Sequence, residues 1–480
     1  MCKTKYAALP AALAKRKANK PGVFKQLLGQ KILSESGLCM FTRKDLQRLI
    51  VPLIIEQILA VTIGMADTVM VSGCGEAAVS GVSLVDSINV LLINIFSALA
   101  TGGAVVASQY LGKRDTENAC IAAKQLLYST TALAAFLMLI SLIFRDGILR
   151  GVFGHIEQDV MDNAQTYFWL SALSYPFLAI YNAGAALFRS MGNSKVSMYT
   201  SILMNLINVG GNALLIFGFQ MGTAGAATAS LVSRMVGAVI MVLLLRNPHN
   251  EVHVIKIFRP EFHWGMVKNI LRIGVPNGLE NSMFQVGKLL VQSLVASFGT
   301  AAIAANAVAG NLASVELIPG NAIGLAIITV IGQCVGARDY TQAKRYAKKL
   351  LGLTYVILWG LSLVVMLSSN LLVGMYQLPA ETSAMAIELI LYHSVCAMVI
   401  WPAAFTLPNV LRAANDVKYT MIVSIASMWS FRIGLSYLLG QGLQLGVLGV
   451  WIAMTADWLF RAILFLIRFL RGKWTQKQLI

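Results

Sequence analysis

Asp67 is the residue of this 480-residue chain whose position points most directly to ion chemistry. It lies well inside an apolar run that covers residues 48–71. A charge at bilayer depth is costly unless it is paired or hydrated, and such residues mark ion and proton pathways. Asn208 and Asn212, four residues apart in a later apolar run, share one helical face. Asp67 is therefore a candidate functional carboxylate, the alternative being a static polar core in which it only hydrogen-bonds to amides.

Further acids and two prolines lie inside other apolar runs. Glu56 and Glu280 each follow a proline, Pro52 or Pro276, by four residues. These glutamates are either solvated or cap a turn that the proline loosens. Because proline also frees a carbonyl and allows bending, Pro52 and Pro276 are candidate hinges. Asp86 is expected near the outer mouth of a cavity.

Charges in the second half of the chain suggest a buried polar network. Its predicted members are Lys288, Glu316, Glu388, Arg432 and Asp457. We expect Lys288 and Arg432 to be neutralised by Glu280, Glu316 or Glu388, because an unpaired buried charge is destabilising. The functional alternative is that these pairs exchange partners or face a ligand. Arg234 and Arg461 are expected to extend towards the cytosolic surface.

Methionine and phenylalanine side chains can form an adaptable apolar cavity wall. The candidates are Met65, Met204, Met283, Phe284 and Met428. The alternative is that they pack between helices or face lipid.

Composition sets the class of protein that must position these residues. The chain is 57% hydrophobic and 12% charged, so it needs lipid as a solvent. A net charge of +17 does not indicate nucleic-acid binding, because the basic residues cluster at the ends of apolar runs and not among stacking aromatic residues. No catalytic constellation or P-loop is present, and no two cysteines have metal-ligand spacing. His249 and His253 have a spacing compatible with a metal, but they lie in a charged loop, where we expect them to be solvated. We therefore expect no enzyme, no cofactor and no metal other than a coupling ion.

Twelve apolar runs predict an all-α membrane protein. They cover residues 48–71, 82–108, 120–144, 160–188, 196–219, 223–246, 267–297, 302–333, 346–371, 383–411, 419–440 and 445–470. Basic residues concentrate in alternate loops, and the positive-inside rule therefore predicts a multi-pass protein of the plasma (inner) membrane with both termini in the cytoplasm.

The chain also matches itself at an offset of 224 positions. Pro52 through Glu56 falls on Pro276 through Glu280, and the segment from Gln109 to Asp115 falls on that from Gln333 to Asp339. Two bundles of six spans, related by a pseudo-two-fold axis along the membrane normal, are therefore expected. The predicted divisions are a basic tail (1–46), a first lobe (47–246), a linker (247–266), a second lobe (267–470) and a short tail (471–480).

Residues 64–71, with the sequence GMADTVMV, resemble the first-helix signature of the multidrug and toxic compound extrusion (MATE) family. Other segments similar to this family, spread over roughly residues 45–470, are 102–112, 189–193, 225–229 and 297–305. The resemblance implies a monomeric exporter of amphiphilic, mostly cationic, organic compounds, driven by inward Na⁺ or H⁺ flux through alternating access of two lobes. Relatives in the wider MOP superfamily flip lipid-linked oligosaccharides, so that function, or export of a specific metabolite, is the alternative.

The same resemblance implies a coupling site. In this family the aspartate at the position of Asp67 serves the ion site of the first lobe, and Asn208 and Ser230 lie where the family often has asparagine and threonine. Asn212 stands where the family often has a carboxylate. One carboxylate with amide and hydroxyl oxygens suits Na⁺, whereas a lone carboxyl group can carry a proton, and both possibilities stay open.

Overall fold

A computed structural model describes residues 40–154, 157–255, 259 and 261–477, and almost all of the predicted N-terminal tail lies outside these ranges. The described residues form helices and connecting loops without strands. The first half contains α2 (Arg43–Ser72), α3 (Glu76–Gly112), α4 (Thr116–Ile143), α5 (Arg145–Phe153), α6 (Gln158–Leu173), α7 (Tyr175–Ser190), α8 (Ser194–Asn212), the π-helix η1 (Ala213–Gly218) and α9 (Gly222–Leu245).

The second half repeats this order with more interruptions. It contains α10 (Trp264–Ala296), α11 (Thr300–Glu316), α12 (Ile318–Gly336), α13 (Tyr340–Leu367), α14 (Ser369–Gly374), α15 (Ala380–Val399), η2 (Pro402–Thr406), α16 (Pro408–Ala413), α17 (Val417–Ser427), η3 (Met428–Leu435), η4 (Leu438–Gly442), α18 (Gly446–Leu470) and η5 (Lys473–Gln476). The π-helices η1 and η4 end the fifth and eleventh spans, which are equivalent in the two halves.

Each of the twelve predicted spans corresponds to a helix or to a broken helix. Ten spans in the described residues are long and apolar enough to cross a membrane, and α6 and α7, bent by 47° relative to each other, make an eleventh. The twelfth is α10, a 33-residue helix whose hydropathy is lowered by Asn277, Glu280, Asn281 and Lys288. The predicted fold class is therefore confirmed.

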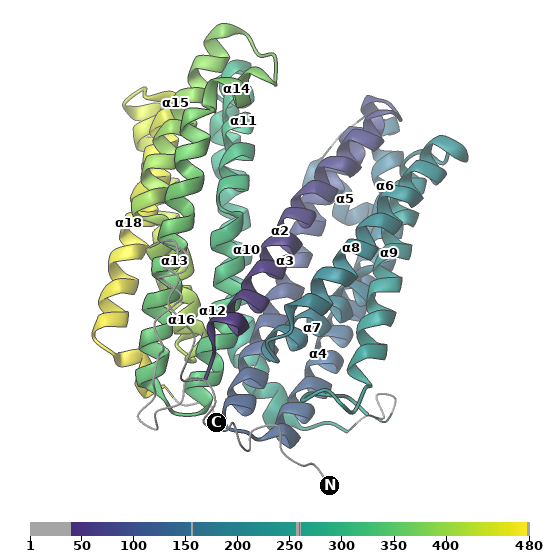
Figure 1. The fold of residues 1–480 in the computed structure, drawn as a ribbon. Helices are drawn as coiled ribbons and strands as arrows, with labels where there is room; N and C mark the ends of the chain where they lie inside the picture. Colours follow the sequence, from purple (N-terminus) through teal and green to yellow (C-terminus); the bar gives the residue numbers. More distant parts are fainter. Residues whose placement is uncertain (1–39, 155–156, 256–258, 260, 478–480) are drawn as a thin grey trace, which may run out of the picture.

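The two six-span bundles form a V that is open at its upper end (Figure 1). At the lower end α3 crosses α12 so closely that a Cβ atom on Gly112 would lie 1.9 Å from the carbonyl oxygen of Gln333. A Cβ on Gly336 would lie 1.9 Å from the carbonyl oxygen of Gln109. The 224-residue offset relates Gly112 to Gly336 and Gln109 to Gln333, so it converts each of these contacts into the other. The pseudo-two-fold axis therefore passes through this crossing.

Side-chain hydrogen bonds at the crossing obey the same symmetry. Gln109 Nε2 donates to the carbonyl oxygen of Ala413 (2.8 Å), and Gln333 Nε2 donates to that of Ser190 (2.7 Å). Each glutamine therefore links its own bundle, by a hydrogen bond, to the loop region of the other bundle. The lower end is thus closed by backbone contact and by hydrogen bonds together.

The first span of each half packs on the opposite bundle near this closed end. Leu46, Leu49 and Leu53 of α2 belong to a buried cluster formed mainly by α12, α13 and α16. Conversely, Ile270 and Ile273 of α10 belong to the core of the first bundle. The two bundles are therefore linked through α2 and α10 as well as through the crossing.

Repeat-related aspartates explain where α4 and α13 begin. Asp115 and Asp339 precede these helices, and each accepts a hydrogen bond from a backbone N–H three residues later. Hydrogen bonds from Asn118 hold the pKa of Asp115 below its usual value. The same capped turn therefore starts the third span of each half.

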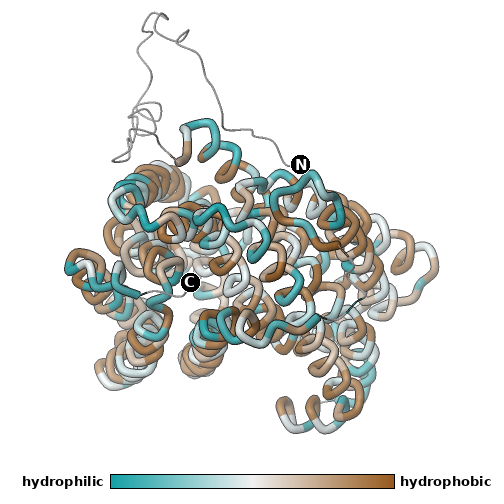
Figure 2. Tube along the Cα trace, turned by 90° about the horizontal axis from the view of Figure 1, so that it is seen from below, coloured by the Kyte–Doolittle hydropathy of each residue, from teal (hydrophilic) through white to brown (hydrophobic). Residues whose placement is uncertain are grey.

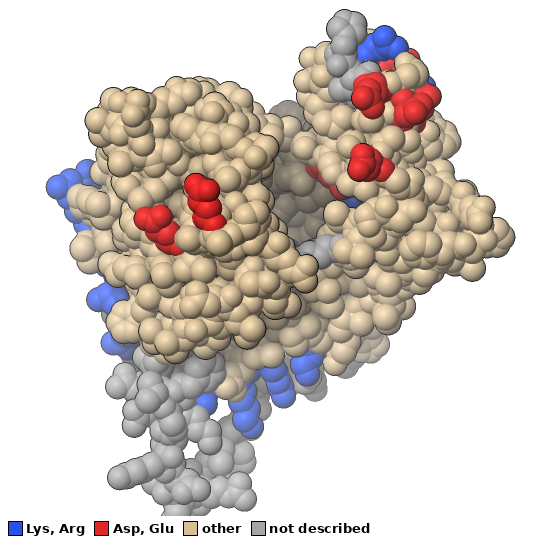
Figure 3. Space-filling model, turned by 90° about the horizontal axis from the view of Figure 1, so that it is seen from above, with Lys and Arg blue, Asp and Glu red and all other residues tan. Residues whose placement is uncertain are grey.

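The surface has the polarity expected of a membrane protein. Seen from below, hydrophilic segments lie across the lower ends of the helices, whereas apolar residues dominate the helices themselves (Figure 2). Seen from above, a hollow separates the bundles, and acidic side chains lie on the end of each bundle (Figure 3). Large apolar side chains on the outer helix faces, such as Leu206 and Leu367, are exposed and so available to lipid.

Candidate functional site

The structure brings together the four residues predicted for the coupling site. Asn212 Nδ2 donates to Asp67 Oδ1 (2.6 Å) and also lies 3.3 Å from Asn208 Oδ1. Asn208 Nδ2 in turn donates to Ser230 Oγ (2.9 Å). These side chains come from α2, α8 and α9, so the group connects the first span to the fifth and sixth.

This oxygen-rich group retains an unused acceptor. Asn212 is fully buried, and its Oδ1 has no hydrogen-bond donor among the described residues. A buried amide oxygen without a donor is unfavourable, and a cation or a protonated group can satisfy it. In the described part of the chain, no three His, Cys, Asp or Glu side chains are grouped as metal ligands. The donor set is thus one carboxylate with amide and hydroxyl oxygens, which fits Na⁺ or a proton.

Asp86 belongs to a second polar group in the same bundle. Its Oδ1 accepts hydrogen bonds from Asn89 Nδ2 (3.1 Å) and from Tyr167 Oη (3.3 Å). Arg234 lies within the bundle as well, and its Nη1 donates to Ser174 Oγ (2.6 Å) at the break between α6 and α7. The expectation that Arg234 extends towards the surface is therefore wrong, because it has a buried acceptor within reach.

Glu56 and Glu280 are paired with arginines and are neither solvated nor caps of proline-loosened turns. Glu280 Oε1 lies 2.7 Å from Arg412 Nη2, and Glu56 Oε1 lies 3.5 Å from Arg189 Nη1. Ser197 also donates to Glu56 Oε2 (2.7 Å). The sequence contained a signal for these pairs. The two glutamates are equivalent in the repeat at an offset of 224, and the two arginines are equivalent at an offset of 223.

The predicted network of the second half is divided into separate groups, and the expected partners of its cations are wrong. Glu316 accepts hydrogen bonds from Ser362, Ser394 (3.1 Å) and the ring of His393 (3.1 Å). It is therefore not a partner of Lys288 or Arg432. Glu388 is exposed on α15. No acidic oxygen among the described residues lies within 4.0 Å of Lys288 Nζ.

Asp457 is the carboxylate that Arg432 and Arg461 share. Arg461 Nε donates to Asp457 Oδ1 (2.7 Å), and Ser427 donates to the same oxygen. Arg432 Nη1 lies 3.7 Å from Asp457 Oδ2, without a hydrogen bond. Arg461 is thus held inside the bundle and does not extend to the surface, because Asp457 lies one helical turn before it on α18.

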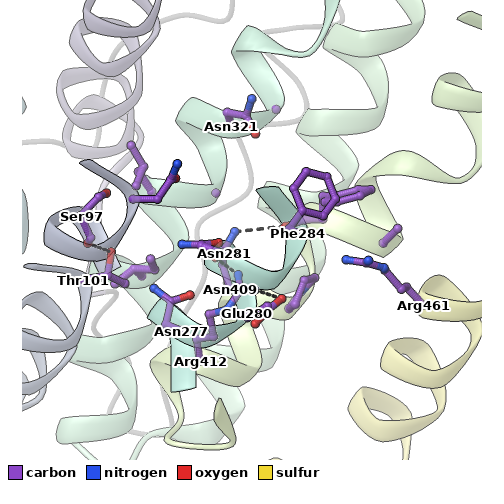
Figure 4. A pocket seen from close by; sticks show the side chains of 18 of the residues that line it. Ser97, Thr101, Asn277, Glu280, Asn281, Phe284, Asn321, Asn409, Arg412 and Arg461 are labelled. Carbon is purple, nitrogen blue, oxygen red and sulfur yellow. Dashed lines mark hydrogen bonds and ion pairs between the residues drawn. The ribbon is translucent and has the colours of Figure 1, made fainter. Parts of the chain in front are cut away.

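Two adjoining cavities lie at the base of the V. One has a volume of about 390 Å³ and is lined by both bundles, including Gln57 and Thr101 from the first and Asn281 and Arg412 from the second. Figure 4 shows its polar side chains converging from α3, α10, α12 and α16. The other, of about 470 Å³, lies mainly against the second bundle. Phe284 lines both cavities, so the two form one central region of a size that suits a small organic molecule.

Phe284 is the candidate from the predicted apolar wall that lines this region. Met204 and Met428, which are related by the repeat, instead pack against Gly237 and Gly287 of neighbouring helices. Glycine leaves room at these contacts, and a flexible methionine fills it. Met283 is half-buried and lines neither central cavity, and the side chain of Met65 lies outside the described part of the chain.

Aromatic residues that the sequence analysis did not select form most of the apolar wall. Trp401 and Phe405 stack with ring centroids 5.4 Å apart, and Trp458 meets Phe405 edge-on at 5.8 Å. Trp401 and Phe405 lie four residues apart and so share a helical face, whereas Trp458 belongs to α18, and this spacing does not show which faces point to lipid. No local pattern therefore distinguished them from aromatic residues that face lipid.

Pro52 and Pro276 both lie inside continuous helices, α2 and α10. Both are buried near the closed lower end. Their role as hinges remains a prediction.

Comparison with known proteins agrees with this architecture. The family model MatE matches residues 52–214 and 276–438, two stretches that begin 224 residues apart, as the internal repeat requires. The "Uncharacterized transporter YisQ" of Bacillus subtilis (strain 168) is 27% identical over 441 residues, which cover 89% of this chain and 94% of that protein. The "Probable multidrug resistance protein NorM" of Thermotoga maritima is 26% identical over 459 residues, with 91% and 94% covered.

A solved structure also aligns over the whole fold. It is described as the outward-facing conformation of a multidrug resistance MATE family transporter of the MOP superfamily. The alignment has a TM-score of 0.85 at 20% identity and covers 96% of this chain and 100% of that one. At this identity the alignment supports the shared fold.

Proposed function

This chain belongs to the MatE family of transporters, and from that premise we propose that it is a cation-coupled antiporter that exports amphiphilic organic compounds. In this proposal Asp67 binds the inward-moving Na⁺ or H⁺ with Asn208, Asn212 and Ser230. The protein works as a monomer in the plasma (inner) membrane, with its lower end and both termini in the cytoplasm. The structure then corresponds to a state whose cavity is open to the outside.

The hydrogen-bonded group around Asp67 is the observation that carries this proposal. Binding of a cation or proton neutralises Asp67 and changes its bond with Asn212, which joins α2 to α8. The first turns of α2 pack on the opposite bundle, so a change in α2 reaches both halves. Pro52 lies among the residues of α2 that pack on the opposite bundle, fifteen residues before Asp67, where it can absorb a bend. Ion occupancy can therefore bias the equilibrium between the two open states.

The test measures dye transport by the full-length protein in proteoliposomes. Sodium and proton gradients are imposed separately, and the dyes are two pyrene compounds with the same body and opposite charges, pyrenebutyrate and pyrenebutyl-trimethylammonium. We expect one gradient alone to drive export, and Asp67→Asn to reduce it to the level of protein-free vesicles. Asp162→Asn, at a carboxylate in α6 far along the chain from this group, is the matched control and should transport as the wild type does.

Two results would contradict the proposal. Gradient-driven export that is unchanged in Asp67→Asn would show that this carboxylate does not couple ion and substrate. Failure of both dyes to move under either gradient would favour a lipid-linked substrate or a specific metabolite.

A further inference from the structure

The wall of the central region formed by the second bundle has more cations than acids. Lys288 and Arg432 line the larger cavity, and Arg461 lines the smaller one. The carboxylate that contacts two of these three cations is Asp457. The formal charge of this group of four residues is therefore +2.

The single negative charge of Asp457 cannot neutralise the whole group. Its Oδ1 is bound by Arg461 and Ser427, and Arg432 Nη1 remains 3.7 Å from Oδ2. Asp457 is also fully buried, whereas Lys288 is exposed to the cavity. In contrast to Arg461, Lys288 has no carboxylate within ion-pair distance in the described ranges.

Other acids near this wall already have partners. Glu280 is paired with Arg412, and Glu316 is enclosed by His393 and two serines. A charge without full neutralisation is expensive at membrane depth. Lys288, which has no carboxylate partner in the described ranges, and Arg432, which shares Asp457 at 3.7 Å, therefore require either water or an anionic ligand. A cationic ligand would add to the repulsion, which is stronger in a region of low dielectric constant than in water.

Aromatic rings lie directly beside these cations. The Arg432 guanidinium lies 5.0 Å from the centroid of Phe284, and that of Arg461 lies 5.5 Å from the centroid of Phe405. The indole N–H of Trp458, a further wall residue, has no acceptor among the described residues. The wall thus combines flat apolar surfaces with hydrogen-bond donors that lack acceptors.

From this arrangement we propose that the cavity selects amphiphilic organic anions, such as aromatic carboxylates or sulfonates. The anionic group binds between Lys288 and Arg432, because ammonium and guanidinium groups form charge-assisted hydrogen bonds with such oxygens. The aromatic body packs against Phe284, Phe405 and Trp401. This inference rests on the proposed export function and replaces the expectation of cationic substrates, which the charges of the wall do not favour.

The experiment compares binding of pyrenebutyrate and pyrenebutyl-trimethylammonium to the purified full-length protein, measured by quenching of tryptophan fluorescence. We expect wild-type protein to bind the anion more tightly. Lys288→Gln should weaken anion binding by about 10- to 100-fold, the effect of losing one charged hydrogen bond. Lys288→Arg should retain it. Glu388→Gln, which removes an exposed charge on α15 outside both cavities, should leave it unchanged.

The outcomes separate this inference from the proposed function. The inference would be overturned if the protein bound the cation more tightly, or if wild type and Lys288→Gln bound the anion equally well. In either case, Asp67-dependent export of either dye would still support antiport. Conversely, Lys288-dependent binding of pyrenebutyrate without export under either gradient would support the anion site and overturn the antiport function.

Discussion

Glu56 and Glu280 occupy equivalent positions in the two halves, yet their ion pairs differ in geometry. Glu280 lies 2.7 Å from Arg412, and both side chains are largely buried. Glu56 lies 3.5 Å from Arg189 and has a second donor in Ser197. Removal of the arginine should therefore be more costly in the second half, because among the described residues Glu280 Oε2 has no hydrogen-bond donor.

The first prediction concerns these pairs. Arg412→Gln should lower the free energy of unfolding by about 3–5 kcal/mol, because it leaves a buried carboxylate unpaired. Arg189→Gln should cost less, since Ser197 still binds Glu56. Denaturant unfolding in mixed micelles measures both. The double variant Glu280→Gln/Arg412→Gln should recover much of the loss, and equal losses for the two single variants would contradict the argument.

At the scale of helices, the lower end closes because α3 and α12 meet through glycines. Gly112 and Gly336 each lie against a backbone carbonyl of the other helix. Side chains of any size would separate the two backbones, since carbon and oxygen atoms cannot approach to 1.9 Å. The crossing is also the place where the two halves must part when the cavity opens downward.

The second prediction is that Gly336→Ala opens this crossing. Ser108 lies fully buried against Gly332, so Ser108→Cys should react slowly with a maleimide in an otherwise cysteine-free protein. Adding Gly336→Ala should raise the labelling rate severalfold, because the methyl group displaces Gln109. Gly352→Ala in α13 is the control, since a Cβ there meets no atom within 4 Å. A labelling rate that stays at the control value would show that the helices close by another contact.

The whole molecule is closed below and open above, and the two first spans, α2 and α10, each cross to the opposite bundle (Figure 1). The family to which the chain belongs consists of transporters, and alternating access requires the closed end to open in turn. A covalent bond across the lower crossing should therefore stop the cycle without unfolding either bundle.

The third prediction tests this requirement. The Cβ that Gly332 lacks would lie 2.8 Å from the Cβ of Ser108. This is about 1 Å shorter than the Cβ–Cβ separation of a disulfide, so a small outward shift of the two helices brings the pair into bonding range. Oxidation of Ser108→Cys/Gly332→Cys in a cysteine-free background should abolish dye export, and reduction should restore it. Each single variant, oxidised in the same way, should remain active. Full activity of the oxidised double variant would rule out separation of the halves at this point.

Apolar runs and internal matches along the chain determined the helical membrane fold, its twelve spans and its duplication. These features depend on stretches of about 20 consecutive residues, so a local sum of side-chain hydropathy is enough to predict them. The residues around Asp67 could also be selected, because Asn208 and Asn212 share a helical face and the family resemblance connected them to Asp67. The structure places these side chains within hydrogen-bond distance.

Only the tertiary structure decided which charges are paired. Glu316 meets His393, 77 residues away, and Gln109 meets Asn415, 306 residues away. Such contacts depend on the rotation and height of whole helices against one another, and nothing in either local segment specifies these quantities. For the same reason, the sequence did not show that Arg432 and Arg461 share Asp457, or that Lys288 has no carboxylate within ion-pair distance in the part of the chain described.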